Sequence, residues 1–258
     1  MEKLLPEIYD YVSLNEDIYN NLLDEAFDFV SSGEIEKSIA IYSYLLDLNN
    51  KDLYVLYELA NSCFYINYFE DAIILYKIII EEDKDYSDIS HLMIGKCYRK
   101  TNQPAKAIEK FEDALIKYPD YKCNLILLEL AQVYYDVEDY FKSKGIFESL
   151  IYLNTGYAQV CFYYISLILV NEGRYKEAVE FHKKISCTQT FFSYYYELAN
   201  LYLKCEDYQN AIDSYKKALE IEPENLKCLY RLGNTYQVSH LYEEAIECDL
   251  RLYNLTAG

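Results

Sequence analysis

Three pairs of a tyrosine and an asparagine are the most distinctive candidates for binding chemistry in this sequence. The two residues of each pair lie four positions apart, which places them on one face of a helix. A tyrosine ring offers a broad amphipathic contact surface, and an asparagine amide both donates to and accepts from a peptide backbone. The pattern therefore predicts a row that reads a peptide: Tyr57 with Asn61, Tyr196 with Asn200, and Tyr230 with Asn234, with Tyr163 at the equivalent place beside Leu167. The alternative is that asparagine is simply common at this position and that tyrosine is abundant throughout the chain.

Basic residues gather at two places in an acidic chain. The 258 residues include 24 lysines and arginines against 43 aspartates and glutamates, a net charge of −19. Residues 1–87 hold five bases and 19 acids, whereas residues 88–123 hold seven bases and five acids. This pattern predicts a partner with a basic segment against residues 1–87 and an acidic segment against residues 88–123. The alternative is that these charges only form a solvated surface. The candidate basic contacts are Lys96, Arg99 and Lys100, and further along the chain Lys227 and Arg231.

No pattern for catalysis or metal binding competes with this interpretation. The sequence has no G-x-G-x-x-G, no Walker lysine loop, no G-x-S-x-G and no H-E-x-x-H, so we predict a protein that is not an enzyme and needs no cofactor. The eight cysteines form no C-x-x-C pair and the three histidines lie far apart, which predicts reduced core thiols and no metal site. The negative charge disfavours nucleic acid and anionic membrane surfaces as partners.

A repeat of 33 to 36 residues supplies the elements that position these side chains. Apolar residues at helical spacing predict two amphipathic helices in each repeat, and two small residues 12 positions apart let the helices cross closely. Gly33 and Gly173 are predicted to cap first helices, Pro104 to begin a second helix, and Pro119 and Pro223 to stop second helices. The small residues are Ala26 and Ser38, Ala60 and Ala72, Gly95 and Ala107, Ala131 and Ser143, Ser166 and Ala178, Ala199 and Ala211, and Gly233 and Ala245.

These small pairs, with aromatic residues such as Tyr202 in a first helix and Tyr215 in a second, resemble the tetratricopeptide repeat over residues 19–258. The resemblance implies an all-α fold, a right-handed superhelical solenoid of antiparallel helix pairs whose first helices line a concave groove. It also implies that the Tyr–Asn row and the basic residues lie in that groove. The predicted organisation is an N-terminal capping segment at residues 1–18 and repeats at approximately 19–52, 53–87, 88–123, 124–158, 159–191, 192–225 and 226–258.

The resemblance predicts a non-catalytic protein–protein interaction scaffold or adaptor that binds a peptide or helix of a partner protein in the groove. The alternative is an accessory repeat region of a larger enzyme or regulator, for instance a transferase, whose catalytic part is not in this chain. Pentatricopeptide repeats bind RNA at a similar period, but such proteins are usually basic. The clamp that holds the acidic C-terminus of heat-shock chaperones is matched at Lys227 and Arg231, whereas Glu197 stands where that clamp needs asparagine.

The sequence gives three further expectations, on location, on an apolar stretch and on self-association. Residues 1–18 show no signal-peptide pattern, which together with the unpaired cysteines predicts a cytoplasmic protein. The apolar stretch Ala158–Val170 is too short to cross a bilayer and predicts a buried helix. The last predicted helix carries Ile246, Leu250 and Tyr253 with no helix after it, which predicts exposed apolar side chains and a weak homodimer through the C-terminal repeat.

Overall fold

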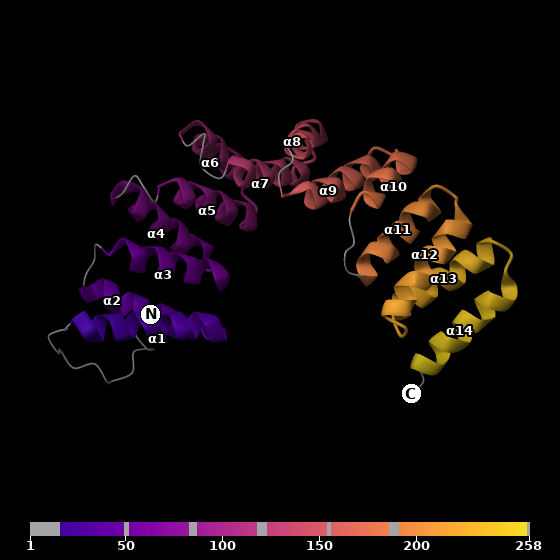
Figure 1. Ribbon diagram of the computed structural model, residues 1–258, viewed down its shortest axis with the longest axis horizontal. Coiled ribbons are helices and arrows are strands. Elements are labelled where there is room, and N and C mark those ends of the chain that lie inside the picture. The colour runs from indigo at the N-terminus through magenta and orange to yellow at the C-terminus, as the bar shows by residue number, and fades with distance from the viewer. Residues whose placement is uncertain are drawn as a thin grey trace. The chain divides into compact units, whose positions relative to one another are not determined.

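The computed structural model describes residues 16–48, 52–82, 87–117, 123–153, 156–185 and 191–256, and within these ranges it contains fourteen α-helices and no strand (Figure 1). The helices come in seven pairs joined by short turns, as the repeat predicts. Their bounds are α1 Glu16–Ser32, α2 Ile35–Leu48, α3 Leu53–Tyr65, α4 Phe69–Glu82, α5 Ser87–Lys100, α6 Pro104–Lys117, α7 Cys123–Asp136, α8 Tyr140–Tyr152, α9 Ala158–Asn171, α10 Tyr175–Lys183, α11 Phe192–Lys204, α12 Tyr208–Ile221, α13 Leu226–Val238 and α14 Tyr242–Thr256.

The chain divides into two compact units, residues 1–138 and residues 139–258. Successive helices pack against each other from α1 to α7 in the first unit and from α8 to α14 in the second (Figure 1). Most of the predicted capping segment, residues 1–15, lies outside the described residues, and its last three residues belong to α1. The stacking of successive pairs is the solenoid arrangement that the repeat predicts.

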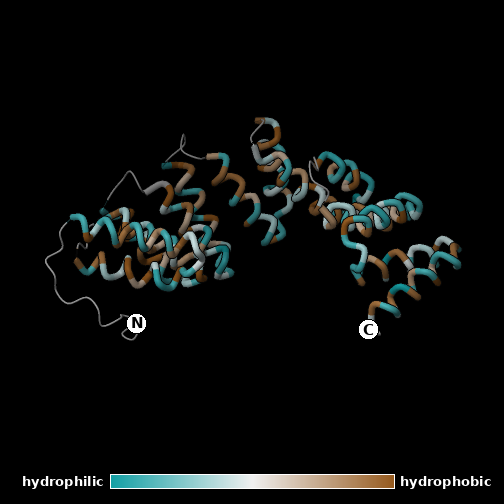
Figure 2. The backbone as a smooth tube through the Cα atoms, turned by 60° about the horizontal axis from the view of Figure 1, so that its bottom comes forward, coloured by the Kyte–Doolittle hydropathy of each residue, from teal (hydrophilic) through white to brown (hydrophobic). Residues whose placement is uncertain are grey.

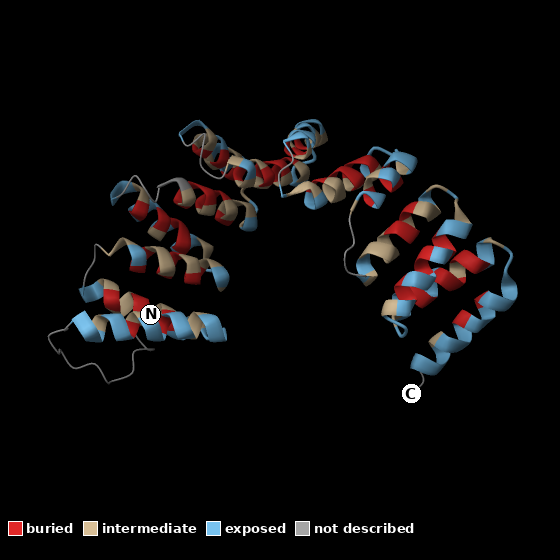
Figure 3. Ribbon diagram, in the orientation of Figure 1, coloured by how far each residue is buried: buried red, intermediate tan, exposed pale blue. Residues whose placement is uncertain are grey.

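All of the small residues are buried, and within each compact unit they lie where the two helices of a pair cross. In Figure 3 the buried residues lie on the sides of the helices that face their neighbours, and in Figure 2 most helices carry both hydrophobic and hydrophilic residues. At Gly95 the two helices approach so closely that its backbone lies directly against the ring of Phe111. Close approach of this kind is the reason for a small residue at a helix crossing.

A left-handed residue ends the first helix of every pair. Gly33 and Gly173 have φ angles of +82° and +74°, which confirms both as the predicted caps. The equivalent turns of the other five pairs also have positive φ, although none of them contains glycine, and the sequence gives no sign of this. Asn and His adopt this region more often than most residues, whereas Glu does so rarely. The five residues are Asn67, Asn102, Glu138, Glu206 and His240.

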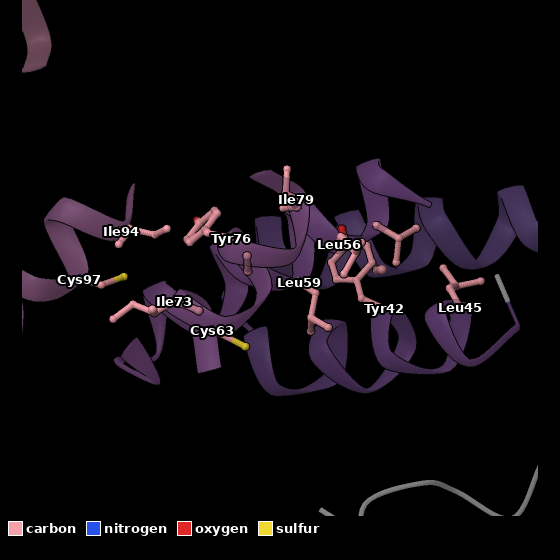
Figure 4. Packing of buried hydrophobic residues seen from close by; sticks show 14 of the residues in the cluster. Tyr42, Leu45, Leu56, Leu59, Cys63, Ile73, Tyr76, Ile79, Ile94 and Cys97 are labelled. Atoms are coloured by element: carbon pink, nitrogen blue, oxygen red, sulfur yellow. The ribbon is translucent and has the colours of Figure 1, made fainter. Parts of the chain in front are cut away.

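Large buried side chains from the second helices fill the space between pairs. Tyr42 in α2 and Tyr76 in α4 are completely buried and belong to one cluster with Leu56, Leu59 and Ile73 (Figure 4). Seven of the eight cysteines lie in the described ranges, all are free thiols, and five of these are buried, as expected for cysteine used as a small core residue.

Candidate functional site

The asparagines of two predicted Tyr–Asn pairs bond within the fold. The hydroxyl group of Tyr76 donates a hydrogen bond of 2.6 Å to the side-chain oxygen of Asn61, and that of Tyr215 donates one of the same length to Asn200. Both tyrosines are completely buried, so each asparagine satisfies a polar group that would otherwise lack a partner. The acceptor oxygens of Asn61 and Asn200 are therefore already engaged.

The tyrosines of these two pairs are also partly used in packing. The ring of Tyr57 meets that of Tyr76 edge-on, with centroids 6.3 Å apart, and the rings of Tyr196 and Tyr215 repeat this contact at 5.8 Å. Such edge-to-face pairs add stability beyond the burial of area. Both first-helix tyrosines are half-buried, and the Lys227 ammonium lies 5.4 Å from the centre of the Tyr196 ring.

One signal in the sequence could have revealed this three-residue arrangement. The pentapeptide Tyr-Glu-Leu-Ala-Asn occurs twice, at residues 57–61 and 196–200, and each time a buried tyrosine follows the asparagine after 15 residues. Helical spacing within one helix places the Tyr and the Asn together, but it does not reveal the hydrogen bond from the second tyrosine to the Asn. The remaining repeats have other combinations at these two positions: Phe27 and Tyr42, Lys96 and Phe111, Gln132 and Phe147, Leu167 and His182, and Asn234 and Asp249.

Tyr42 shows what happens when the asparagine is missing. Its side chain is completely buried, and its hydroxyl group has no hydrogen-bond partner among the described residues, because Phe27 stands where the second and sixth repeats have asparagine. Burial raises the pKa of Tyr42 to about 12, and the nearby charge of Glu58 adds to this effect. A buried hydroxyl group without a hydrogen-bond partner lowers the stability of the folded chain, so tyrosine is an unusual residue at this buried position.

Two of the predicted basic contacts form ion pairs inside the first compact unit. Lys96 and Arg99 of α5 both reach Glu129 of α7, each at 3.4 Å. Arg99 also donates to Asp136 over 2.7 Å and to Gln132. Lys100, at the end of the same helix, is exposed. The local excess of basic charge in α5 is therefore largely matched by acids of the next first helix.

Tyr163 and Glu197 form a link between α9 and α11. Tyr163 is half-buried and donates a hydrogen bond to the Glu197 carboxylate, which partly offsets the rise in the pKa of Glu197 that burial causes. The Glu197 carboxylate stands where the clamp that holds the acidic C-terminus of heat-shock chaperones requires an asparagine. Its charge opposes the binding of an acidic peptide terminus at this point.

Helix α13 carries the predicted residues that are most exposed. The Tyr230 side chain is 58% exposed, and Lys227 and Arg231 are exposed beside it. Among the residues that the structure describes, neither Lys227 nor Arg231 forms an ion pair with a carboxylate. Asn234 is half-buried on the same helix face, and no tyrosine stands 15 residues after it. This face thus offers an aromatic ring, two cations and an amide.

Two features of the described ranges bear on other classes of function. No group of three or more histidine, cysteine or acidic side chains is placed there to hold a metal ion. None of the helices in these ranges has the length and apolar character that are required to cross a lipid bilayer.

Comparison with known proteins identifies the repeat. Models of the family described as tetratricopeptide repeat match residues 90–121, 192–225 and 214–247. The match at residues 90–121 covers most of the helix pair α5–α6, and the match at residues 192–225 covers the whole of the pair α11–α12. The chain belongs to the tetratricopeptide repeat family. The seven helix pairs of the described ranges are accordingly tetratricopeptide repeats, and α13, whose exposed face is described above, is the first helix of the last one.

Similar tetratricopeptide repeat proteins are known from several sources. A TPR repeat-containing protein of Methanocaldococcus jannaschii is 22% identical over 90% of this chain, and this chain spans 38% of the length of that relative. The solved C-terminal part of a TPR repeat-containing protein from Cytophaga hutchinsonii has a TM-score of 0.70 at 17% identity, covering 78% of this chain and 79% of that one. YrrB, described as a TPR protein with an unusual peptide-binding site, has a TM-score of 0.55 at 19% identity, covering 74% and 96%. These structural similarities concern the fold.

Proposed function

We propose that this tetratricopeptide repeat protein is a non-catalytic adaptor that binds a peptide or helix of a partner protein on the face of its first helices. The observation that carries the proposal is the exposed ring of Tyr230 on α13, with the exposed side chains of Lys227 and Arg231 beside it. The similarity of the fold to YrrB supports it, because that protein is described as having a peptide-binding site.

The proposed contacts follow from the chemistry of these side chains. Tyr230 supplies a rigid ring with broad contact area, and the Asn234 amide supplies hydrogen bonds to a peptide backbone. Lys227 and Arg231 attract an acidic side chain of the partner, whereas the nearby Glu197 in α11 disfavours the carboxylate of a chain terminus. The peptide should therefore present an internal acidic residue beside an apolar or aromatic one.

The test is capture from a lysate of the organism that carries the gene, comparing wild type with the double variant Tyr230→Ala/Asn234→Ala. The control is Tyr152→Ala, which removes a still more exposed tyrosine from the end of a second helix in the same compact unit. We expect a partner that the double variant loses and the control retains. A partner that all three proteins retain equally would place the interface away from the first helices.

The alternative is that this region is the accessory part of a larger enzyme or regulator. The observation that favours it is the length relation to the Methanocaldococcus jannaschii protein, of which this chain spans 38%. Reading the gene beyond the codon for Gly258 tests it, and a stop codon at that point would contradict it. The cytoplasmic location expected from the sequence stays a prediction.

Self-association through α14 is a separate prediction. Ile246, Leu250 and Tyr253 are more than half exposed along one side of this helix, where earlier second helices pack against the next pair. We expect a weak homodimer in which two such faces meet, detectable by sedimentation velocity as a mass that rises with concentration. Ile246→Lys should abolish the rise, and a mass of 30.6 kDa at all concentrations would contradict the prediction.

A further inference from the structure

We infer that Glu58, in the second repeat, is the centre of a binding site for a lysine or arginine side chain of a basic peptide segment. The inference deepens the proposed function, because it rests on the partner lying along the first helices. Glu58 belongs to α3, next to Tyr57 and one turn before Asn61. The site differs from the exposed face of α13 in location and in the sign of its charge.

The first argument is that Glu58 is an incompletely solvated carboxylate without a cation. Burial raises its pKa, and a hydrogen bond from Asn61 partly offsets this rise. None of the ion pairs in the described ranges includes Glu58. A partly desolvated carboxylate gains more from a nearby cation than one in open water does.

The second argument is that the same repeat position shows a filled version of this site elsewhere in the chain. Glu129 stands two residues before the small residue of its repeat, as Glu58 does, and its side chain is only 13% exposed. There the preceding first helix, α5, delivers Lys96 and Arg99 to the carboxylate. The equivalent positions of α1, which precedes α3, hold Phe27 and Val30 instead, so the fold itself supplies no cation to Glu58.

The third argument is the buried hydroxyl group of Tyr42. It has no partner among the described residues, and the charge of Glu58 is the strongest single influence of another residue on its pKa. An ammonium or guanidinium group bound at Glu58 carries several N–H donors, and a phenol oxygen can accept from one of them. Tyr54, whose ring is 47% exposed, provides an aromatic surface on the same helix.

The surroundings of the site have the charge that attracts a basic segment. In the ranges 16–48 and 52–82 there are fourteen acidic residues and two lysines. One of the lysines, Lys37, is paired with Glu34, and the other, Lys77, lies on the second helix α4. Asp24 and Asp52 add negative charge near Tyr54, whose pKa they help to raise. Such a field speeds the encounter with a basic peptide and selects against an acidic one.

The experiment measures binding of fluorescein-labelled octalysine by fluorescence anisotropy at low ionic strength. Wild type is compared with Glu58→Gln and with Glu81→Gln, which removes one charge from an exposed position at the end of α4. Because both variants change the net charge equally, a purely diffuse attraction weakens equally in both. We expect Glu58→Gln to weaken binding about tenfold, because the Glu58 carboxylate is partly buried. We expect Glu81→Gln to weaken it by less than about twofold, because an exposed charge contributes little to binding.

A second variant tests the site without removing the carboxylate. Phe27→Lys places a lysine at the position from which Lys96 reaches Glu129, so it should occupy the site from within the chain. We expect it also to weaken octalysine binding about tenfold. Both variants should keep their helical circular dichroism and melt no earlier than wild type, because each relieves an uncompensated carboxylate.

Equal losses in Glu58→Gln and Glu81→Gln, or no binding of octalysine by the wild type, would overturn the inference. These outcomes are separate from those of the partner capture, which depends on Tyr230 and Asn234. A partner that needs the α13 residues but not Glu58 would leave the proposed function standing without the cation site. Selective octalysine binding, together with a partner that the α13 variant still captures, would support the cation site at Glu58 and contradict the proposed role of the α13 face.

Discussion

Replacing Gly95 by alanine should lower the free energy of unfolding by about 1–3 kcal/mol, the range expected for overpacking a core. A Cβ at this position would lie 2.8 Å from Phe111 Cδ1 and Cζ, and closer still to Cε1. The phenylalanine ring is completely buried, so it has little room to move away. Urea unfolding followed by far-ultraviolet circular dichroism measures the change.

Gly145→Ala is the matched control for this prediction. Gly145 also lies within a helix, α8, but no atom would lie within 4 Å of its added Cβ. Alanine should therefore stabilise the helix there by about 0.5–1 kcal/mol, through its better helix propensity. The double variant Gly95→Ala/Phe111→Leu should recover part of the lost stability by making room for the methyl group. Equal effects of Gly95→Ala and Gly145→Ala would show that the crossing is not tight.

Replacing Asn61 by leucine should lower the free energy of unfolding by about 1–3 kcal/mol, because it leaves the buried Tyr76 hydroxyl group without its acceptor. The double variant Asn61→Leu/Tyr76→Phe should regain most of this, since both polar groups are then absent. The converse change, Phe27→Asn, offers the Tyr42 hydroxyl group an acceptor and should raise stability by about 1 kcal/mol.

Asn234→Leu is the control for this second prediction. Asn234 has the same repeat position as Asn61, but Asp249 stands where the second repeat has Tyr76. We expect its replacement to change the urea midpoint little. If Asn61→Leu and Asn234→Leu were equally mild, the Tyr76–Asn61 hydrogen bond would contribute no stability and the structural role assigned to Asn61 would be wrong.

The repeat made the fold predictable from the sequence alone. Two small residues 12 positions apart mark each helix crossing, and this signal survives even where aromatic and proline positions vary. The left-handed turns at Glu138 and Glu206 were not predictable, because glutamate rarely adopts positive φ. At Glu206 the flanking helices α11 and α12 pack against each other, and this packing favours the turn despite its residue type.

The candidate site was predictable only in part. Helical spacing correctly places each tyrosine and asparagine of a pair on one helix face, but whether an asparagine side chain is available depends on a residue 15 positions later on another helix. Asn61 meets Tyr76 and is engaged, whereas Asn234 has no such tyrosine. The pairing of Arg99 likewise depends on acids more than 29 residues away, at Glu129 and Asp136. Single-helix patterns do not contain this information.

Site-specific photo-crosslinking tests the central claim, that partners bind the first-helix face, most directly. A benzoylphenylalanine is placed at position 230 on α13 and, in a second protein, at position 152 on α8, and both are irradiated in lysate of the organism that carries the gene. Both side chains are exposed tyrosines in the same compact unit, at 58% and 88%. The account predicts a defined crosslinked partner from position 230 and none from position 152. A partner crosslinked from position 152 alone would contradict it.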